Sequence, residues 1–266
     1  MNLFIYASDL AVITGHNTFK NKDEIILKLW KTHFPKEYTY FLNKHTLKTP
    51  ETNLDYIKTT SKKYTIKNIS EKIEKCKEVE STQELAKQQA SLIDEFKKLP
   101  KDDFEKIKKS IVSETNTSFG SKHENKVLQH YYESTGIELL SIDSFFKKKV
   151  LQTEDYNWYL GGRIDGIHKD KSTIIEVKNR VHRLFYNLRD YEKVQIFAYM
   201  HILNISKSVL VEGFNAQESC VINSIPVSYD IDYWNKHIYS KLIAFIEEFE
   251  LFLKDEDAKL TIFFKF

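Results

Sequence analysis

Cysteine is nearly absent from this chain. Its 266 residues contain only Cys76 and Cys220, which lie far apart in unlike surroundings. Two thiols cannot build a disulfide framework, and within one chain they cannot supply the ligands of a thiolate zinc site or of a four-cysteine iron–sulfur cluster. We therefore expect a protein of a reducing compartment that carries no iron–sulfur cluster.

Long apolar runs are missing as well. No stretch approaches the ~18 consecutive apolar residues that indicate a membrane span. The beginning of the chain, MNLFIYASD, has neither the basic region nor the cleavage site of a secretory signal. We expect an intracellular protein of the cytoplasm, the nucleus or a viral replication site.

Charge of one sign is not in excess. The 40 basic and 38 acidic residues give a net charge of +2, so the whole-chain charge does not indicate a polyanion partner. A nucleic-acid surface would have to come from local clusters of basic residues. Two such clusters are Lys147–Lys149 and the set Arg180, Arg183, Arg189 and Lys193.

Hydrophobic residues, by contrast, make up 41% of the chain and aromatic residues 14%. This composition allows a sizeable core, and the length fits one large α/β domain or a domain with an insertion. Residues 37–118 contain no glycine, and their apolar residues recur at helical spacings. We expect them to form a mostly helical insertion within a single domain of residues 1–266, with an antiparallel helical pair over 68–99.

A β-hairpin is the central local prediction. Two short β-branched runs, Arg163–His168 and Thr173–Lys178, flank the polar residues 169–172. With the turn centred on residues 170 and 171, partner numbers sum to 341, so Asp165 lies opposite Glu176. Side chains alternate between the two faces of a strand. One face is then expected to carry Arg163, Asp165, Glu176 and Lys178, and the other Ile164, Ile175 and Val177.

Two carboxylates that face each other across a hairpin repel, because their Cβ atoms are about 4.5 to 5.5 Å apart. A shared proton, a neighbouring cation or a divalent metal can offset the repulsion, and an Asp/Glu pair suits Mg²⁺ or Mn²⁺. Lys178 would then stand beside the metal, where a water or a phosphate could be held. The alternative is a solvated face with diagonal ion pairs, Asp165 to Lys178 and Arg163 to Glu176, each worth under ~1 kcal/mol.

Four motifs occur in the order found in one nuclease superfamily. Segment Asp165–Lys178, with ten residues between the aspartate and the glutamate of Glu-Val-Lys, resembles the D…(D/E)xK signature of the PD-(D/E)XK nucleases. Segment Gly120–Glu124 resembles the GxxxE helix of the phage lambda exonuclease and YqaJ-like viral recombinase branch. Gln195–Tyr199 resembles the QxxxY helix of RecB-like members, and Ser8–Gly15 the SD…G helix entry of YqaJ-like proteins.

The resemblance implies an α/β, restriction-endonuclease-like fold with a mixed central sheet flanked by helices. It implies a metal-dependent exonuclease that hydrolyses linear duplex DNA in recombination or repair, with Mg²⁺ or Mn²⁺ as cofactor. From lambda-like relatives it implies ring trimers and a single-strand annealing protein as partner. The implied metal ligands are Glu124, Asp165, Glu176 and the Val177 carbonyl. Lys178 and Gln195 would orient the attacking water, and the implied substrate contacts are Ser8, Arg163, Arg180 and Tyr199.

Plainer roles stay open for several of these residues. Ser8, with Asp9, fits a helix N-cap that needs no ligand. Glu124 fits a surface position on one helix over 119–136 that ends at Gly136, and Arg180 fits an ordinary surface arginine. Two other functions also stay open: a RecB-like or structure-specific endonuclease, and a catalytically inactive DNA-binding module.

The rest of the chain is expected to complete the α/β core. The patterns predict a helix over 22–33, one strand or irregular segment over 137–152, strands over 208–214 and 219–227, and a long helix over 230–253. The apolar tail, residues 260–266, is predicted to add a strand or a subunit contact.

Overall fold

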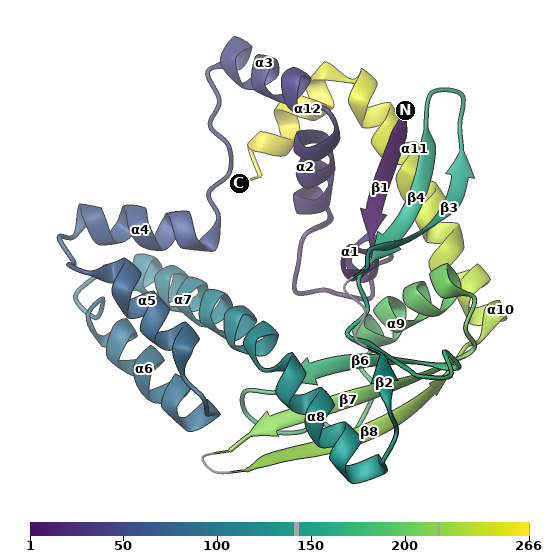
Figure 1. Ribbon diagram of the computed structural model, residues 1–266. Helices are drawn as coiled ribbons and strands as arrows, with labels where there is room; N and C mark the ends of the chain where they lie inside the picture. Colours follow the sequence, from purple (N-terminus) through teal and green to yellow (C-terminus); the bar gives the residue numbers. More distant parts are fainter. Residues whose placement is uncertain (141–143, 217–218, 266) are drawn as a thin grey trace.

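Two β-sheets with one helix between them form the centre of the protein (Figure 1). The structure, a computed structural model, describes residues 1–140, 144–216 and 219–265. Helix α9 (Asp190–Leu203) contacts β3 and β4 of one sheet and β6 and β7 of the other. Within the described ranges, no helix has both the length and the apolar character needed to cross a membrane.

The smaller sheet has the strand order β1-β4-β3. β1 (Asn2–Tyr6) runs parallel to β4 (Asn157–Gly162), and β3 (Phe146–Gln152) is antiparallel to β4. Trp158 and Leu160 of β4 are fully buried in a core that they share with helices from both ends of the chain. Those helices are α1 (Ala7–Ile13), α2 (Lys22–His33), α3 (Pro35–His45), α11 (Ser240–Lys254) and α12 (Glu256–Phe263).

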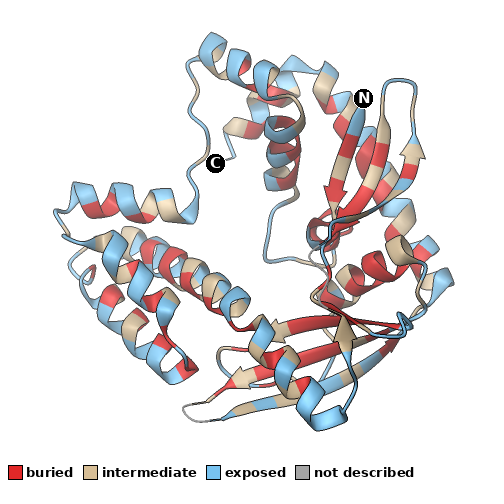
Figure 2. Ribbon diagram, in the orientation of Figure 1, coloured by how far each residue is buried: buried red, intermediate tan, exposed pale blue. Residues whose placement is uncertain are grey.

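The larger sheet has the order β2-β5-β6-β7-β8, with β6 and β7 parallel and the other neighbours antiparallel. Helix α8 (Glu124–Thr135) covers one face, and α9 covers the other. β6 and β7 lie in the middle and are mostly buried, as Figure 2 shows. The strands are β2 (Leu139–Leu140), β5 (Gly166–His168), β6 (Thr173–Asn179), β7 (Lys207–Asn215) and β8 (Cys220–Ser228).

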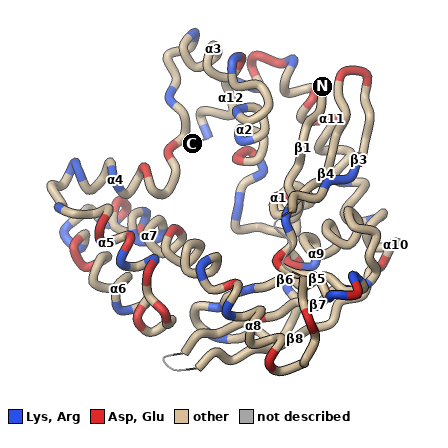
Figure 3. The backbone as a smooth tube through the Cα atoms, in the orientation of Figure 1, with Lys and Arg blue, Asp and Glu red and all other residues tan. Residues whose placement is uncertain are grey.

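A group of four helices stands to one side of the sheets (Figure 1). Its apolar faces build a separate core that includes Ile57, Phe96 and Ile111. Figure 3 shows basic and acidic residues intermixed along these helices. The members are α4 (Asn53–Lys63), α5 (Ile69–Glu78), α6 (Thr82–Asp94) and α7 (Lys101–Lys122). Helices thus occupy the segment predicted to be helical, and α5 and α6 are the predicted pair. Its role as an insertion in a single domain stays a prediction.

Several other predicted elements are confirmed. The helix over 22–33 is α2, and the two strands after α9 are β7 and β8. The long helix over 230–253 is present as α10 (Ile231–Tyr233), a π-helical segment η1 (Trp234–Tyr239) and α11. The segment 137–152 contributes β2 and β3, and its residues 141–143 lie outside the described part of the chain.

Three local predictions are wrong. The tail is not a strand: helix α12 extends into it, and Asp255 caps that helix by accepting from the Ala258 N–H. The alternative of a subunit contact stays a prediction, and residue 266 lies outside the described part. Ser8 does not cap α1, since that helix begins at Ala7 with Tyr6 as N-cap. The single helix over 119–136 is two helices, α7 and α8, which meet at His123.

Candidate active site

The register of the β5–β6 hairpin is the predicted one. Gly166 pairs with Ile175 and Ile167 with Ile174, and both pairs of numbers sum to 341. The first strand is shorter than predicted, because the ladder begins only at Gly166. Residues 163–165 carry the chain from β4 in one sheet to β5 in the other. As a result Ile164 is buried in the main core, away from the cluster of Ile175 and Val177 under α8.

Asp165 continues the ladder with its side chain. Its Oδ2 accepts a hydrogen bond of 2.7 Å from the backbone N–H of Val177. If β5 were longer, this N–H would face the backbone of a β5 residue. The N–H and C=O of one strand residue point to the same edge. The Val177 carbonyl therefore also points to the edge of β6 at which Asp165 lies.

A chain of hydrogen bonds runs from β6 to α9. Lys178 Nζ donates to Glu176 Oε1 at 2.6 Å and to Gln195 Oε1 at 3.2 Å. Gln195 Nε2 then donates to the Tyr199 hydroxyl at 3.3 Å. Glu176 and Lys178 are two residues apart on one strand, so their side chains lie on the same face of the sheet. That face is the one toward α9, since Lys178 contacts Gln195. Gln195 and Tyr199 are one turn apart on the facing helix.

Tyr199 is held by close packing against a glycine. A Cβ on Gly162 would come within 2.7 Å of the Tyr199 ring, so no larger residue fits there without moving the ring. Tyr199 is only 5% exposed. Its hydroxyl faces Gln195, so it orients that amide and does not lie open to a substrate. Its predicted role as a substrate contact is not supported.

The acids of this site are poorly solvated. Burial first, and the neighbouring charge of Asp165 second, raise the pKa of Glu176 to about 7. Burial also raises the pKa of Asp165 to about 6, against the opposing effect of Lys178. Burial, the largest single effect, lowers the pKa of Lys178, but the charge and hydrogen bond of Glu176 together with the charges of Asp165 and Glu192 outweigh it, and the net shift is upward. Lys178 is therefore an ammonium ion beside acids that resist ionisation.

Glu124 joins the site from the other face of the sheet. It is the first residue of α8, and burial followed by the charge of Glu176 raises its pKa. The turn before it is fixed by His123, whose Nε2 lies 3.0 Å from the Val79 carbonyl. The Gly120 carbonyl accepts a hydrogen bond of 2.7 Å from Asn179 at the end of β6. The helix junction thus places Glu124 near the acids of β6.

The donor set has the chemistry of a Mg²⁺ or Mn²⁺ site. Glu176 Oε2 is buried and has no hydrogen-bond partner among the described residues, an arrangement that costs free energy unless a cation or proton satisfies it. Asp165 and Glu124 are acids close enough to shift with it. In the described ranges, no three His, Cys, Asp or Glu side chains are grouped tightly enough to hold a metal as they stand. The residues therefore fit a hard divalent ion in type, without a closed cage.

Ser8 and Arg163, two other predicted substrate contacts, directly follow residues that lie side by side: a Cβ on Gly162 would come within 3.4 Å of the Ala7 Cβ. Their roles as substrate contacts stay predictions. Ser8 is exposed on α1, and Arg163 is exposed between β4 and β5. Arg180 is buried: its guanidinium pairs with Glu192 at 2.6 Å and with Glu212 at 2.7 Å. This corrects its predicted place as a phosphate contact, because the side chain is already used inside the protein.

Sequence reasoning missed two features: the pairing of Arg180 with Glu192 and Glu212, and the hydrogen bond from Asn179 to the Gly120 carbonyl. Glu212 lies in the middle of the apolar strand β7, and an acid in such a run signals a buried partner. Glu192 carries the same signal on the mostly apolar helix α9. Asn179 has no comparable signal, because an asparagine at a strand end usually belongs to a turn.

The fold has weak likeness to solved nucleases. An alkaline exonuclease (LHK-Exo) from Laribacter hongkongensis aligns with a TM-score of 0.42 at 14% identity, over 70% of this chain and 91% of that chain. LHK-Exo in complex with dAMP aligns with a TM-score of 0.40 at 14% identity, over 66% and 87%. No curated protein matches the chain in sequence.

A family model matches more than half of the chain. The model of the YqaJ-like viral recombinase domain covers residues 52–205. That range contains Gly120–Glu124, Asp165–Lys178 and Gln195–Tyr199, and it leaves out Ser8–Gly15. The resemblance read from the motifs is confirmed, and this chain belongs to the family of YqaJ-like viral recombinase domains.

Proposed function

We propose that this protein is a divalent-metal-dependent exonuclease that hydrolyses linear duplex DNA in recombination or repair. The observation that carries the proposal is the buried Glu176, whose Oε2 has no hydrogen-bond partner in the described part of the chain, while Asp165 and Lys178 lie beside it. The family description as a viral recombinase supports DNA as the substrate. That role calls for a single-strand annealing protein as a partner.

The proposed ligands of the metal are Asp165, Glu176 and the Val177 carbonyl, with Glu124 joining directly or through water. Their oxygen donors suit Mg²⁺ or Mn²⁺. When bound, the ion would supply charge neutralisation for the phosphate and for the leaving oxygen.

Lys178 is the proposed water-positioning and phosphate-contacting group. Two of its three N–H donors go to Glu176 and Gln195 among the described residues, and the third can reach a phosphate oxygen or the attacking water. Gln195 holds the ammonium on the α9 side: its Oε1 faces the lysine, which can only donate, and its Nε2 donates to the Tyr199 hydroxyl. These two residues keep the lysine aimed and so raise the effective concentration of the nucleophile.

The test is digestion of end-labelled linear duplexes with Mg²⁺ or Mn²⁺, beside a closed circular duplex of the same sequence. We expect nucleotides from the linear DNA and little cleavage of the circle. Lys178→Ala should abolish release, whereas Lys207→Ala, at an exposed lysine on the neighbouring strand β7, should leave it unchanged. Equal activity of the Lys178→Ala protein would overturn the proposal, and fast nicking of the circle would favour a structure-specific endonuclease.

A further inference from the structure

Exposed aromatic and basic side chains gather beside the candidate site, on two loops that are far apart in sequence. One loop joins α1 to α2 and carries Phe19, which is 84% exposed. The other joins β6 to α9 and carries Tyr186, which is 69% exposed. Large aromatic side chains at such exposure gain little from folding, and their faces are open to a partner outside the fold.

The second loop is anchored by a buried ionic network. Glu212 accepts backbone hydrogen bonds from Phe185 at 3.2 Å and from Tyr186 at 2.8 Å. The same carboxylate is clamped by Arg180. Tyr186 has a φ of 57°, a left-handed conformation that is uncommon for a bulky residue. The protein thus uses a buried charge pair to hold an exposed ring in a strained position, which is typical of functional segments.

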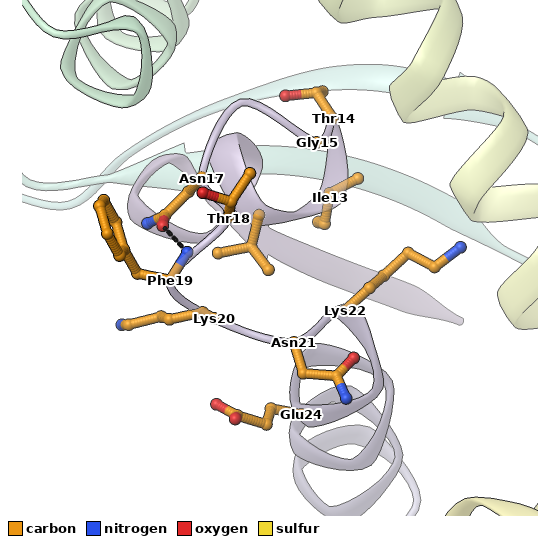
Figure 4. A pocket seen from close by; sticks show the side chains of 11 residues that line it. Ile13, Thr14, Gly15, Asn17, Thr18, Phe19, Lys20, Asn21, Lys22 and Glu24 are labelled. Carbon is orange, nitrogen blue, oxygen red and sulfur yellow. Dashed lines mark hydrogen bonds between the residues drawn. The ribbon is translucent and has the colours of Figure 1, made fainter.

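The first loop is brought to the same place by α9. The rings of Phe19 and Tyr191 meet edge to face, with their centroids 6.4 Å apart. Figure 4 shows the side chains of Phe19 and Lys20 leaving the loop on the same side and Lys22 leaving on the other. The Phe19 ring therefore lies at the start of α9, and Lys20 is the next residue of the same loop.

Two neighbouring hollows connect Tyr191 and Tyr186 with the end of strand β6. One, of about 340 Å³, is lined by Asn179, Arg183, Phe185 and Tyr191 among others. The other, of about 610 Å³, continues along Arg183 and Phe185 to Tyr186. Asn179 directly follows Lys178 in β6, so the first hollow begins at the end of the strand that carries Glu176 and Lys178, and the second extends to the exposed ring. We call the surface of Phe19, Lys20, Arg183, Tyr186 and Tyr191 the aromatic track.

We propose that the aromatic track binds single-stranded DNA, with bases stacked on Phe19 and Tyr186 and phosphates held by Lys20 and Arg183. This inference rests on the proposed function, because a nuclease acting on duplex ends must guide an unpaired strand to or from its site. Base faces are open to side-chain rings only in unpaired strands. Lys20 and Arg183 supply positive charge that complements the phosphates. One exposed acid, Asp190, lies next to the track.

The test is fluorescence anisotropy with a labelled oligothymidine in EDTA, so that no cleavage occurs. We expect Phe19→Ala and Tyr186→Ala each to weaken binding about 5- to 150-fold, the range for loss of one stacked base. Tyr186→Phe should bind like wild type because the ring remains. Phe264→Ala and Tyr40→Ala are matched controls, since these rings are 82% and 68% exposed elsewhere, and they should leave binding unchanged.

Arg183→Ala should weaken binding at low salt and reduce the salt dependence by about one phosphate contact. Unchanged affinity in both Phe19→Ala and Tyr186→Ala, or an equal loss in the two controls, would overturn the track. A loss confined to a duplex probe would do the same.

The outcome for the track is separable from that for the nuclease. Lys178→Ala protein should fail to cleave with Mn²⁺, while its binding of oligothymidine in EDTA should still weaken when Phe19→Ala is added. If wild-type protein does not cleave but its single-strand binding depends on Phe19 and Tyr186, the track stands without the nuclease. If it cleaves and the track variants bind normally, the nuclease stands without the track. Thermal melts of each variant show whether a change in binding reflects unfolding.

Discussion

Asp165 takes the place of a strand residue opposite Val177, since its Oδ2 accepts the Val177 N–H at 2.7 Å. The hydrogen bond ties an acid to the end of a ladder and turns the adjacent carbonyl toward it. The Asp165 carboxylate therefore has two tasks: it accepts the Val177 N–H, and it is a proposed metal ligand. A substitution of the same shape can separate them.

Asp165→Asn should keep the structural task and lose the chemical one. The amide oxygen can still accept from Val177, while the negative charge beside Glu176 is gone. We expect nuclease activity to fall at least about 100-fold, more than the loss usual for groups that only support a metal ligand. The melting temperature in EDTA should stay the same or rise, because repulsion with Glu176 is removed.

Asp170→Asn, in the exposed turn of the same hairpin, is the control for Asp165→Asn and should change neither property. Retained activity in Asp165→Asn would show that this acid is not part of the metal site.

The geometry of this acid was only half readable from the sequence. Counting residues across the turn gave the correct register, because alternation and turn length fix it. Counting did not show that β5 begins only at Gly166, because the crossing from β4 to β5 depends on the two sheets being separate. Likewise, the helix break at His123 depends on a contact with Val79, 44 residues away, which no local pattern contains.

Metal binding should depend on Glu176. Its unpartnered Oε2 would gain a ligand, and binding to the folded state alone raises stability by about 2.7 kcal/mol at 100 times the dissociation constant. We expect Mn²⁺ to raise the melting temperature of wild type and EDTA to reverse the rise. Glu176→Gln should abolish the response, whereas Glu138→Gln, at an exposed acid near β2, should keep it. A full Mn²⁺ response in Glu176→Gln, seen by calorimetry, would refute the site.

Arg180→Met should destabilise the protein strongly. The change leaves Glu192 and Glu212 buried without their counterion, and breaking a buried pair in this way costs about 3 to 5 kcal/mol. Urea unfolding would measure the loss. Arg183→Met, at the exposed arginine of the same loop, should change the free energy of unfolding by less than about 0.5 kcal/mol. Normal stability with impaired DNA binding in Arg180→Met would restore it as a phosphate contact.

Acid should weaken the fold in part through His201. Burial lowers the pKa of this histidine to about 4 from an ordinary value of 6.5, and its ring stacks on Trp234 with centroids 4.4 Å apart. Between these two pH values the unfolded chain binds more protons than the folded protein. Stability therefore falls as the pH falls through this window.

His201→Phe keeps an aromatic ring on Trp234 but cannot be protonated. Its free energy of unfolding relative to that of wild type should rise as the pH falls from about 6.5 to 4, because only wild type binds a proton at this position on unfolding. Other groups act alike in both proteins: the raised pKa values of Asp165 and Glu176 oppose the effect, and burial lowers the pKa of other histidines in the same direction as that of His201. Those are His16, His33, His123 and His168. Identical slopes for the two proteins would contradict the assignment to His201.

Gly213→Ala should disturb the seat of α8. A Cβ at this position of β7 would come within 2.2 Å of Val127 Cγ2, and Val127 is fully buried. The helix must shift, so we expect a loss of about 1 to 3 kcal/mol in the free energy of unfolding. Activity should fall as well, because Glu124 begins the same helix.

Val127→Ala removes the two methyl groups that the new Cβ would strike, and alone it should leave a small cavity. In the double variant the added and the lost volume offset each other, so the destabilisation should be smaller than the sum of the single changes by about 0.5 to 3 kcal/mol. Gly120→Ala is the matched control: nothing lies within 4 Å of its Cβ, and an alanine there should stabilise α7 by roughly 0.5 to 1 kcal/mol. Additive losses in the double variant would mean that Val127 does not set how closely α8 approaches the sheet.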